Sequence, residues 1–238
     1  DSLEALTQLV EESSHPEWLS RFEYCRKKEH ERVVLRELDS QSDEMSMAEV
    51  IHLLSEKTNG EAILVTDVGQ HQMVAQRYYQ FRDYRTNVTS GGLGTMGFCL
   101  PAAMGAKLAR PEKQVLAVIG DGGFQMTVQE LGTIMQSGID VKVLILNNEF
   151  LGMVRQWQEL FFEKRYSFTN MQNPDFQCLA DAYGIKSRKV TQRADLASSI
   201  VDFVGHEGSY LLEVVVAKEN NVFPMVETGK SVAEVRLE

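Results

Sequence analysis

The sequence has few of the features that stabilise secreted or membrane-embedded proteins. Its 238 residues include five prolines and three cysteines, and the longest uninterrupted apolar run is Val115–Ile119. A run this short does not span a bilayer, and the acidic N-terminus has no apolar segment of the signal-peptide type. Cys25, Cys99 and Cys178 cannot all pair with one another, so we expect reduced thiols in a cytoplasmic compartment.

Positive charge is also scarce. The chain has 24 Lys and Arg residues against 34 Asp and Glu residues, which gives a formal net charge of −10. Nucleic acids and anionic membranes attract proteins through clustered positive charge. We therefore expect neither as a partner. The hydrophobic content of 43% is nevertheless that of an ordinary soluble globular protein.

Residues 1–45 differ from the rest of the chain. They contain two helical patterns, at 3–12 and 16–28, followed by a strongly charged stretch without alternating strands. We interpret residues 1–45 as a linker and the tail of a preceding domain, and a helical arm packed on the core is the alternative. The chain begins with Asp1 and not with Met, which favours a part of a longer polypeptide.

Helix signals become clear from Ser46 onward. Ser46 and Glu49 form a capping box that predicts a helix to about residue 57. Thr127 and Glu130 form a second capping box, and Gly138 predicts the end of that helix. The remaining helices are predicted at residues 70–79, 97–108, 152–164, 174–182 and 194–204.

Short apolar runs alternate with these helices. They predict strands at residues 62–66, 115–119, 141–146, 187–190 and 210–216. Continuously apolar strands separated by helices indicate an α/β fold, with a doubly wound, mainly parallel sheet in three layers and helices on both faces. We assign this domain to residues 46–238. Ligands of such sheets bind beyond the carboxyl ends of the strands.

A glycine turn follows the first predicted strand. Gly69 leaves free backbone N–H groups at the start of a helix, and with Gln70 and His71 it forms a candidate anion site. A tight turn with a solvated histidine is the alternative, and this segment alone does not decide between the two.

A second glycine-rich segment, at residues 91–97, contains GLGTMG, the G-x-G-x-x-G spacing of a dinucleotide site. Its context is poor for that function. Residues 86–90 are polar and short where a buried first strand is required, and Pro101 falls in the first turns of the following helix. A nicotinamide-dependent dehydrogenase is therefore the weaker hypothesis.

The strongest motif joins two neighbouring strands. Gly120, Asp121 and Gly122 follow strand 115–119, and after a 24-residue gap strand 141–146 is followed by Asn147 and Asn148. A right-handed βαβ crossover brings the ends of these strands side by side. One carboxylate and one amide oxygen then meet, and such hard oxygen ligands suit Mg²⁺ or Ca²⁺. Mg²⁺ is usually completed by phosphates and water. Glycines beside the carboxylate allow a phosphate to approach the backbone.

A GDG segment followed by NN at this separation resembles the thiamine diphosphate signature. The surrounding segments GQHQM (69–73), GGLGTMGFCLPAAMGA (91–106), NNEFLGMVRQWQ (147–158) and NVFPM (221–225) closely resemble acetohydroxyacid synthase, also called acetolactate synthase. The resemblance covers roughly residues 46–226. It identifies the C-terminal, diphosphate-binding domain of the catalytic subunit.

The resemblance implies a role for each matching residue. Mg²⁺ would be bound by the side chains of Asp121 and Asn148 and by the backbone carbonyl of Phe150. The diphosphate would be held by Gly69, Gln70, His71, Gly120, Gly122, Gly123 and the turn Asn148, Phe150, Leu151 and Gly152. The aminopyrimidine would lie against Gly94, Thr95 and Met96, with Met96 bending the cofactor.

The next helix would cover the active site. Met153 and Trp157 are four residues apart and share a helix face. In the family these positions lie over the cofactor, and the Trp shapes the pocket for the second 2-oxo acid. A stripe of core residues is the alternative for this pair.

The implied reaction condenses pyruvate with a second 2-oxo acid, pyruvate or 2-oxobutyrate, with loss of carbon dioxide, in branched-chain amino acid biosynthesis. Thiamine diphosphate supplies that chemistry. The glutamate that activates the cofactor comes in the family from an N-terminal domain of a neighbouring subunit, and FAD lies in a middle domain. We therefore expect no catalytic residue within this chain, an inactive isolated fragment, a homodimer or tetramer, and a possible regulatory subunit.

Three other functions remain open. Another thiamine diphosphate enzyme, a decarboxylase or an oxidase, would share the metal motif but not GQHQM or the Met153 and Trp157 pair. A dehydrogenase would bind NADH without Mg²⁺. A non-catalytic binding or assembly domain is the third, and the absence of the activating glutamate from this chain favours it.

Overall fold

The computed structural model describes residues 1–38 and 42–238. Its centre is a six-stranded parallel sheet in the order β2-β1-β3-β4-β6-β5. The strands are β1 (Ile63–Thr66), β2 (Asn87–Val88), β3 (Val115–Gly120), β4 (Lys142–Asn147), β5 (Lys186–Val190) and β6 (Tyr210–Val215). The doubly wound α/β fold is confirmed. The five predicted strands agree with the observed ones to within one residue, whereas β2 is too short and polar for the sequence to have indicated it.

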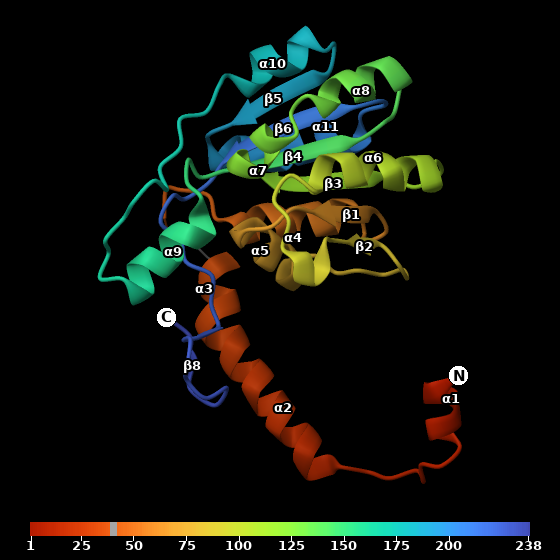
Figure 1. Ribbon diagram of the computed structural model, residues 1–238, viewed down its shortest axis with the longest axis vertical. Coiled ribbons are helices and arrows are strands. Elements are labelled where there is room, and N and C mark those ends of the chain that lie inside the picture. Colours follow the sequence, from red (N-terminus) through yellow and green to blue (C-terminus); the bar gives the residue numbers. More distant parts are fainter. Residues whose placement is uncertain (39–41) are drawn as a thin grey trace.

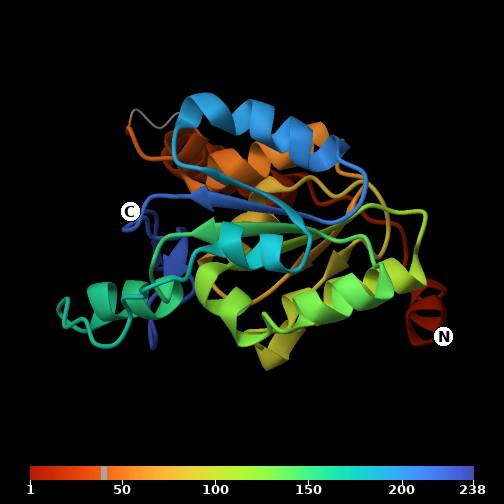
Figure 2. The same ribbon diagram turned by 90° about the horizontal axis from the view of Figure 1, so that it is seen from above.

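Helices cover both faces of the sheet (Figures 1 and 2). On one face lie α4 (Met47–Lys57), α5 (Gln70–Tyr78) and α11 (Arg193–Gly205), and on the other lie α6 (Cys99–Ala109), α8 (Glu130–Ser137) and α10 (Phe176–Ala182). Successive residues of a strand point to opposite faces of the sheet. Leu116 and Val118 pack on the face covered by α4, α5 and α11, whereas Ala117 and Ile119 pack on the face covered by α6, α8 and α10. Because both of their faces are buried, the inner strands β1, β3, β4 and β6 are mostly apolar and not alternating, whereas the edge strands β2 and β5 are more polar and partly exposed.

Two further helices begin at the carboxyl edge of the sheet. The helix α7 (Asp121–Met126) starts directly after β3, and α9 (Gly152–Phe161) starts shortly after β4. The prediction of a helix start at Thr127 was wrong. Residues 121–126 are already helical, Thr127 Oγ1 donates to the Gly97 carbonyl at 3.1 Å, and α8 begins only at Glu130. Gly138 ends that helix with φ of 60°, as expected.

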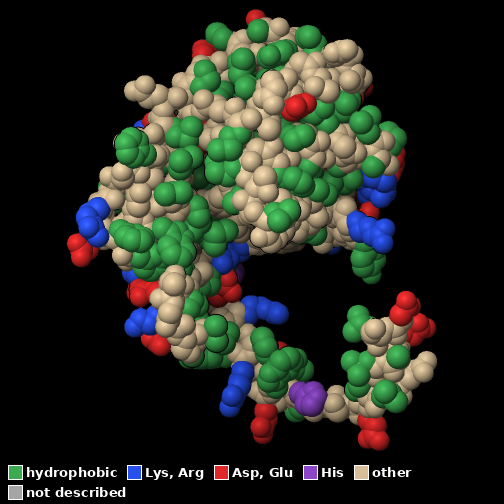
Figure 3. Space-filling model, in the orientation of Figure 1, with side chains coloured by type: hydrophobic (Ala, Val, Ile, Leu, Met, Phe, Trp, Pro, Cys, Tyr) green, Lys and Arg blue, Asp and Glu red, His purple; other side chains and the backbone are tan. Residues whose placement is uncertain are grey.

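The N-terminal residues form an arm that projects from the sheet (Figure 1). It consists of α1 (Ser2–Thr7), α2 (Pro16–Glu29), a π-helical turn (His30–Val34) and α3 (Leu35–Leu38). The first helix is shorter than the predicted 3–12. Apolar side chains of α2 such as Trp18 and Phe22 are exposed along the arm (Figure 3). No residue of α1 or α2 is buried, whereas Val33 near the end of the arm is buried.

The chain ends in a small hairpin of β7 (Met225–Val226) and β8 (Val235–Arg236). In the described part of the chain, no helix is both long and apolar enough to cross a membrane.

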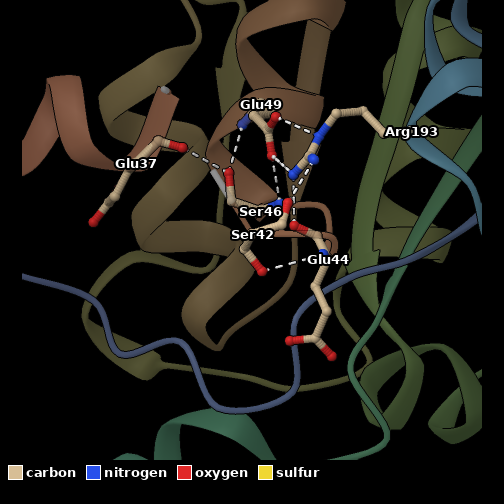
Figure 4. A network of polar contacts seen from close by, with 6 residues as sticks. All are labelled: Glu37, Ser42, Glu44, Ser46, Glu49 and Arg193. Carbon is tan, nitrogen blue, oxygen red and sulfur yellow. Dashed lines mark hydrogen bonds and ion pairs between the residues drawn. The ribbon is translucent and has the colours of Figure 1, made fainter. Parts of the chain in front are cut away.

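A polar network fixes the start of α4 (Figure 4). The predicted capping box is present: Glu49 N–H donates to Ser46 Oγ at 3.0 Å, and Ser46 N–H donates to Glu49 Oε2 at 2.7 Å. Ser46 Oγ also donates to the Glu37 carbonyl at 2.9 Å, which joins α3 to α4. Arg193 on α11 donates to Glu49 Oε1 at 2.9 Å and to the carbonyls of Ser42 and Glu44.

We expect Ser46→Ala to lower the free energy of unfolding by about 1–2 kcal/mol, because a buried cap and its link to α3 are both lost. Ser137→Ala is the matched control, since Ser137 is exposed in the last turn of α8. Chemical denaturation measures both changes. Equal stability of the two variants would contradict the structural role of the cap.

Candidate functional site

A small cavity of about 50 Å³ lies at the carboxyl end of the sheet, where the segments after β1, β3 and β4 meet. It brings together most of the residues singled out in the sequence: Gly69, Gln70, His71, Met96, Gly120, Asp121, Gly122, Gly123, Asn148, Phe150, Leu151, Gly152 and Met153. Met47, Val68, Leu146 and Val154 also line it, and the sequence had not indicated them. Gly94, Thr95 and Trp157 lie outside this cavity.

Strand register explains why Asp121 and Asn148 converge. In the β3–β4 pair, Gly120 lies opposite Leu146. Asp121 directly follows Gly120, and Asn147 directly follows Leu146. The two segments therefore reach the carboxyl edge of the sheet at the same height. The following turn then carries Asn148 into the cavity.

The two adjacent asparagines have different surroundings. Asn147 is fully engaged: its Nδ2 donates to Glu213 Oε1 at 2.7 Å, and its Oδ1 accepts from Glu149 N–H at 3.0 Å. Asn148 lines the cavity, where its Nδ2 lies 3.4 Å from Gln70 Oε1 and its Oδ1 accepts from Phe150 N–H at 3.3 Å. Of the two, Asn148 is therefore the asparagine that lines the cavity.

Asp121 is 1% exposed, and burial raises its pKa to about 6. A side-chain hydrogen bond from Asn173 and backbone N–H groups oppose that shift by stabilising the carboxylate. Asn173 Nδ2 donates to Asp121 Oδ2 at 2.7 Å. No sequence pattern indicated Asn173, because it is 52 residues away and lies in a loop without a recognisable motif.

His71 is the clearest sign of an anion site. It is 5% exposed and lines the cavity, and its Nε2 has no hydrogen-bond partner among the described residues. Burial lowers the pKa of His71 to about 4, so the imidazole is neutral near pH 7. A buried ring nitrogen without a partner costs free energy. An acceptor such as a phosphate oxygen would satisfy it.

Side chains approach the site glycines too closely for any other residue. A Cβ on Gly152 would lie 2.2 Å from Gln70 Oε1, and one on Gly123 would lie 1.8 Å from Asp67 Oδ2. Glycine at these positions lets the neighbouring side chains lie directly against the backbone beside the cavity. Together with two hard oxygen donors and an unpaired histidine nitrogen, this glycine-rich backbone fits a diphosphate with a divalent cation.

The GLGTMG segment is mostly exposed. Gly94 has φ of 57°, and Thr95 N–H donates to Ser90 Oγ at 2.9 Å, while Met96 is half-buried at the cavity. The strand directly before this segment is the two-residue edge strand β2, which does not provide the buried first strand of a dinucleotide fold.

The two residues chosen on α9 lie at different depths. Met153 lines the cavity, and Trp157 is 39% exposed one turn further along. Trp157 lies in an open depression of about 420 Å³ with Val154 and Phe162. Its ring packs edge-on against the ring of Phe161, with 4.9 Å between the ring centroids. It is therefore not a core residue, contrary to the alternative interpretation of this helix.

Comparison with known proteins identifies the family of this chain. Residues 67–214 match the family described as "Thiamine pyrophosphate enzyme, C-terminal TPP binding domain". The chain is 48% identical over 192 residues to the acetolactate synthase large subunit of Lactococcus lactis, which covers 80% of this chain and 33% of that protein. It is 44% identical over 233 residues to the mitochondrial acetolactate synthase of Schizosaccharomyces pombe, covering 96% and 34%.

A third relative, the acetolactate synthase isozyme 2 large subunit of Escherichia coli, is 44% identical over 183 residues, covering 76% of this chain and 33% of that protein. The chain thus spans about a third of the length of the curated relatives that it matches. It belongs to the thiamine pyrophosphate enzyme family, in which it represents the C-terminal TPP-binding domain, and its relatives are acetolactate synthases.

Proposed function

We propose that this chain binds thiamine diphosphate as its Mg²⁺ complex and forms the diphosphate-binding half of an acetolactate synthase active site. The observation that carries this proposal is the cavity lined by Asp121, Asn148 and His71, in which His71 is buried and its Nε2 has no hydrogen-bond partner among the described residues. The similarity to acetolactate synthases over most of the chain supports the same activity. Residues 46–238 would form the cofactor domain, and residues 1–45 the linker and tail of a preceding domain.

Each group in the cavity has a role in this proposal. Asp121, Asn148 and the carbonyl of Phe150 would hold Mg²⁺, which the carboxylate favours by charge. The diphosphate would accept hydrogen bonds from His71 Nε2 and from backbone N–H groups of Gly122 and Gly123 at the start of α7, where a helix N-terminus favours an anion. Gln70 would fix the Asn148 amide, and Gly94, Thr95 and Met96 would lie beside the aminopyrimidine.

When bound, thiamine diphosphate supplies the electron sink for decarboxylating pyruvate and joining the product to a second 2-oxo acid. The residues of this chain orient that cofactor and shape the space next to it. Met153 would exclude water from the cavity, and Trp157 would contact the side chain of the second 2-oxo acid. The activating glutamate and FAD would come from parts of the enzyme that this chain does not contain.

The partners follow from the names of the relatives. Three of them are called large subunits, so we propose a small regulatory subunit. We also propose a homodimer or tetramer of catalytic chains. The three cysteines are unpaired in the described chain, which suits the proposed cytoplasmic location. Relatives also include proteins named as mitochondrial and chloroplastic.

Calorimetry with thiamine diphosphate in the presence and absence of Mg²⁺ tests the proposal on the chain itself. We expect binding that requires Mg²⁺ and that is not replaced by NADH. Equal binding without a divalent cation would contradict the assigned metal site. Acetolactate formation, measured against acetaldehyde formation in a polypeptide that supplies the rest of the relatives' length, separates this activity from that of a simple decarboxylase.

In such a complete polypeptide, we expect Trp157→Leu to preserve acetolactate formation from two pyruvates and to lower the preference for 2-oxobutyrate. One methylene group in an apolar pocket is worth about 1–3 kcal/mol of discrimination. The ratio of products from mixed substrates measures the effect. Phe162→Leu, on the same depression but just beyond the end of α9, is the control. An equal change of the product ratio in both variants would contradict the assignment of Trp157 to the substrate pocket.

A further inference from the structure

Asn173 links the two strands that carry the candidate metal ligands. It lies in the loop between α9 and α10, and its Nδ2 donates both to Asp121 Oδ2 at 2.7 Å and to Asn147 Oδ1 at 3.0 Å. Its own Oδ1 accepts from Gln125 Nε2 on α7 at 2.8 Å. Both hydrogens of the amide and its oxygen are therefore used, which leaves one orientation of the Asn173 side chain that satisfies all three contacts.

The network continues along the sheet edge. Asn147 Nδ2 donates to Glu213 Oε1 on β6 at 2.7 Å, and Lys189 Nζ on β5 lies 2.9 Å from the same oxygen. Glu213 is 1% exposed and Lys189 is 45% exposed in its side chain. The buried carboxylate of Glu213, paired with Lys189, therefore holds the far end of the hydrogen-bond network that reaches Asp121.

We propose that Asn173 is a positioning residue for the metal carboxylate, and this inference rests on the proposed function. Without Asn173, the Asp121 side chain would lose its side-chain hydrogen-bond donor and would rotate about its Cα–Cβ and Cβ–Cγ bonds. With Asn173 in place, one carboxylate oxygen is held by the amide, and the plane of the carboxylate is fixed before a cation arrives. Orienting a ligand in advance raises metal affinity, and removing such a supporting contact typically costs a factor of about 10–100.

The position of the network explains why the support comes from a distant loop. Asp121 begins α7, so its immediate neighbours Gly122 and Gly123 have no side chains to brace it. Those glycines are needed because a Cβ on Gly122 would lie 2.9 Å from both Leu151 Cδ2 and Met171 Sδ. The loop after α9 therefore provides the amide that the glycine turn lacks.

The test is a titration of the chain with Mn²⁺ at saturating thiamine diphosphate, following free Mn²⁺ by its electron paramagnetic resonance signal. We expect Asn173→Leu, which keeps the branched shape and the number of side-chain heavy atoms but removes all hydrogen bonds, to weaken Mn²⁺ binding by about 10–100-fold. Asn170→Leu is the matched control, because Asn170 is exposed in the same loop and the described contacts include no hydrogen bond from its side chain.

A second variant keeps the inference testable if Asn173→Leu does not fold. Gln125→Leu leaves Asn173 in place and removes only the group that orients its amide, so we expect the same effect with a smaller amplitude. Thermal melting without ligands measures stability separately. A residue that only supports the fold would lower Tm and leave the Mn²⁺ affinity of the folded chain unchanged, which would overturn the proposal.

The outcomes separate the two proposals. If the unsubstituted chain binds no Mn²⁺ with thiamine diphosphate, the proposed function fails and this inference with it. If the unsubstituted chain binds and Asn173→Leu, or Gln125→Leu in its place, binds equally well, only the positioning role is wrong. Weaker binding in these variants and unchanged binding in Asn170→Leu would establish it.

Discussion

Asp121→Asn is expected to abolish Mg²⁺-dependent binding of thiamine diphosphate while making the ligand-free chain more stable near pH 7. Asp121 is the one residue with a charged side chain among the three proposed metal ligands, and its loss removes most of the attraction for the cation. The gain in stability has a separate cause. Burial disfavours the ionised carboxyl and raises its pKa from 3.8 to about 6.

The sign and range of that gain follow from linkage. Between pH 3.8 and about 6, the folded chain holds the Asp121 proton more tightly than the unfolded chain, so the stability of the unsubstituted protein falls as pH rises through this range. Above about pH 6, burial of the ionised Asp121 carboxylate costs the folded protein about 3 kcal/mol of stability. The neutral amide carries no such cost. The stability difference between Asp121→Asn and the parent should therefore be largest near pH 7 and shrink toward pH 4.

Denaturation of both proteins between pH 4 and pH 8, without metal, measures this difference. His71 also titrates anomalously, because burial lowers its pKa to about 4. It is present in both proteins, so its contribution cancels in the comparison. Asn148→Ala is the companion variant, and we expect it to weaken cofactor binding less, since a neutral ligand is lost. A less stable Asp121→Asn chain at pH 7 would show that the carboxylate is better solvated than its burial indicates.

Gly152→Ala is expected to reduce cofactor affinity by a factor of about 10–100, although alanine is the better helix former by about 1 kcal/mol. Gly152 is the first residue of α9, and its Cβ would lie 2.2 Å from Gln70 Oε1 and 2.8 Å from Asn148 Nδ2. Both side chains belong to the candidate site. The added methyl group would push them out of their present positions and separate the Asn148 amide from Gln70.

Gly105→Ala is the matched control for this substitution. Gly105 lies within α6, and a Cβ added there would meet no atom within 4 Å beyond its chain neighbours and the backbone of its own helix. That variant should be more stable than the parent and bind the cofactor equally well. Calorimetric titration with thiamine diphosphate and Mg²⁺ measures both variants. Unchanged binding by Gly152→Ala would mean that Gln70 and Asn148 move without consequence, and would weaken their assignment to the site.

The sequence by itself determined the sheet and the family. Apolar runs such as residues 115–119 are continuous because their strands are buried on both faces, so local composition predicts them to within one residue. The glycine and asparagine motifs after the strands also act locally, because a strand end and the turn after it are contiguous in the chain. For this reason Asp121 and Asn148 could be selected before their meeting point was known.

Where local signals competed with tertiary contacts, the prediction failed. Thr127 and Glu130 have the spacing of a capping box, but Glu130 N–H donates to the Thr127 backbone carbonyl at 3.0 Å and not to its hydroxyl, which points to the Gly97 carbonyl of another segment. The true capping box at Ser46 and Glu49 formed as predicted, since its two reciprocal hydrogen bonds are both made and Arg193 reinforces them.

Only the tertiary structure showed what distinguishes the surroundings of the two asparagines and what holds Asp121. Asn147 and Asn148 are identical in type and adjacent, and the difference between them comes from Glu213 and Asn173, which bind Asn147 from distant parts of the chain. Such contacts have no spacing pattern, because hydrogen-bond partners across a sheet edge are set by strand order and loop path. The sequence therefore specified the chemistry of the candidate site, and packing specified the orientation of its groups.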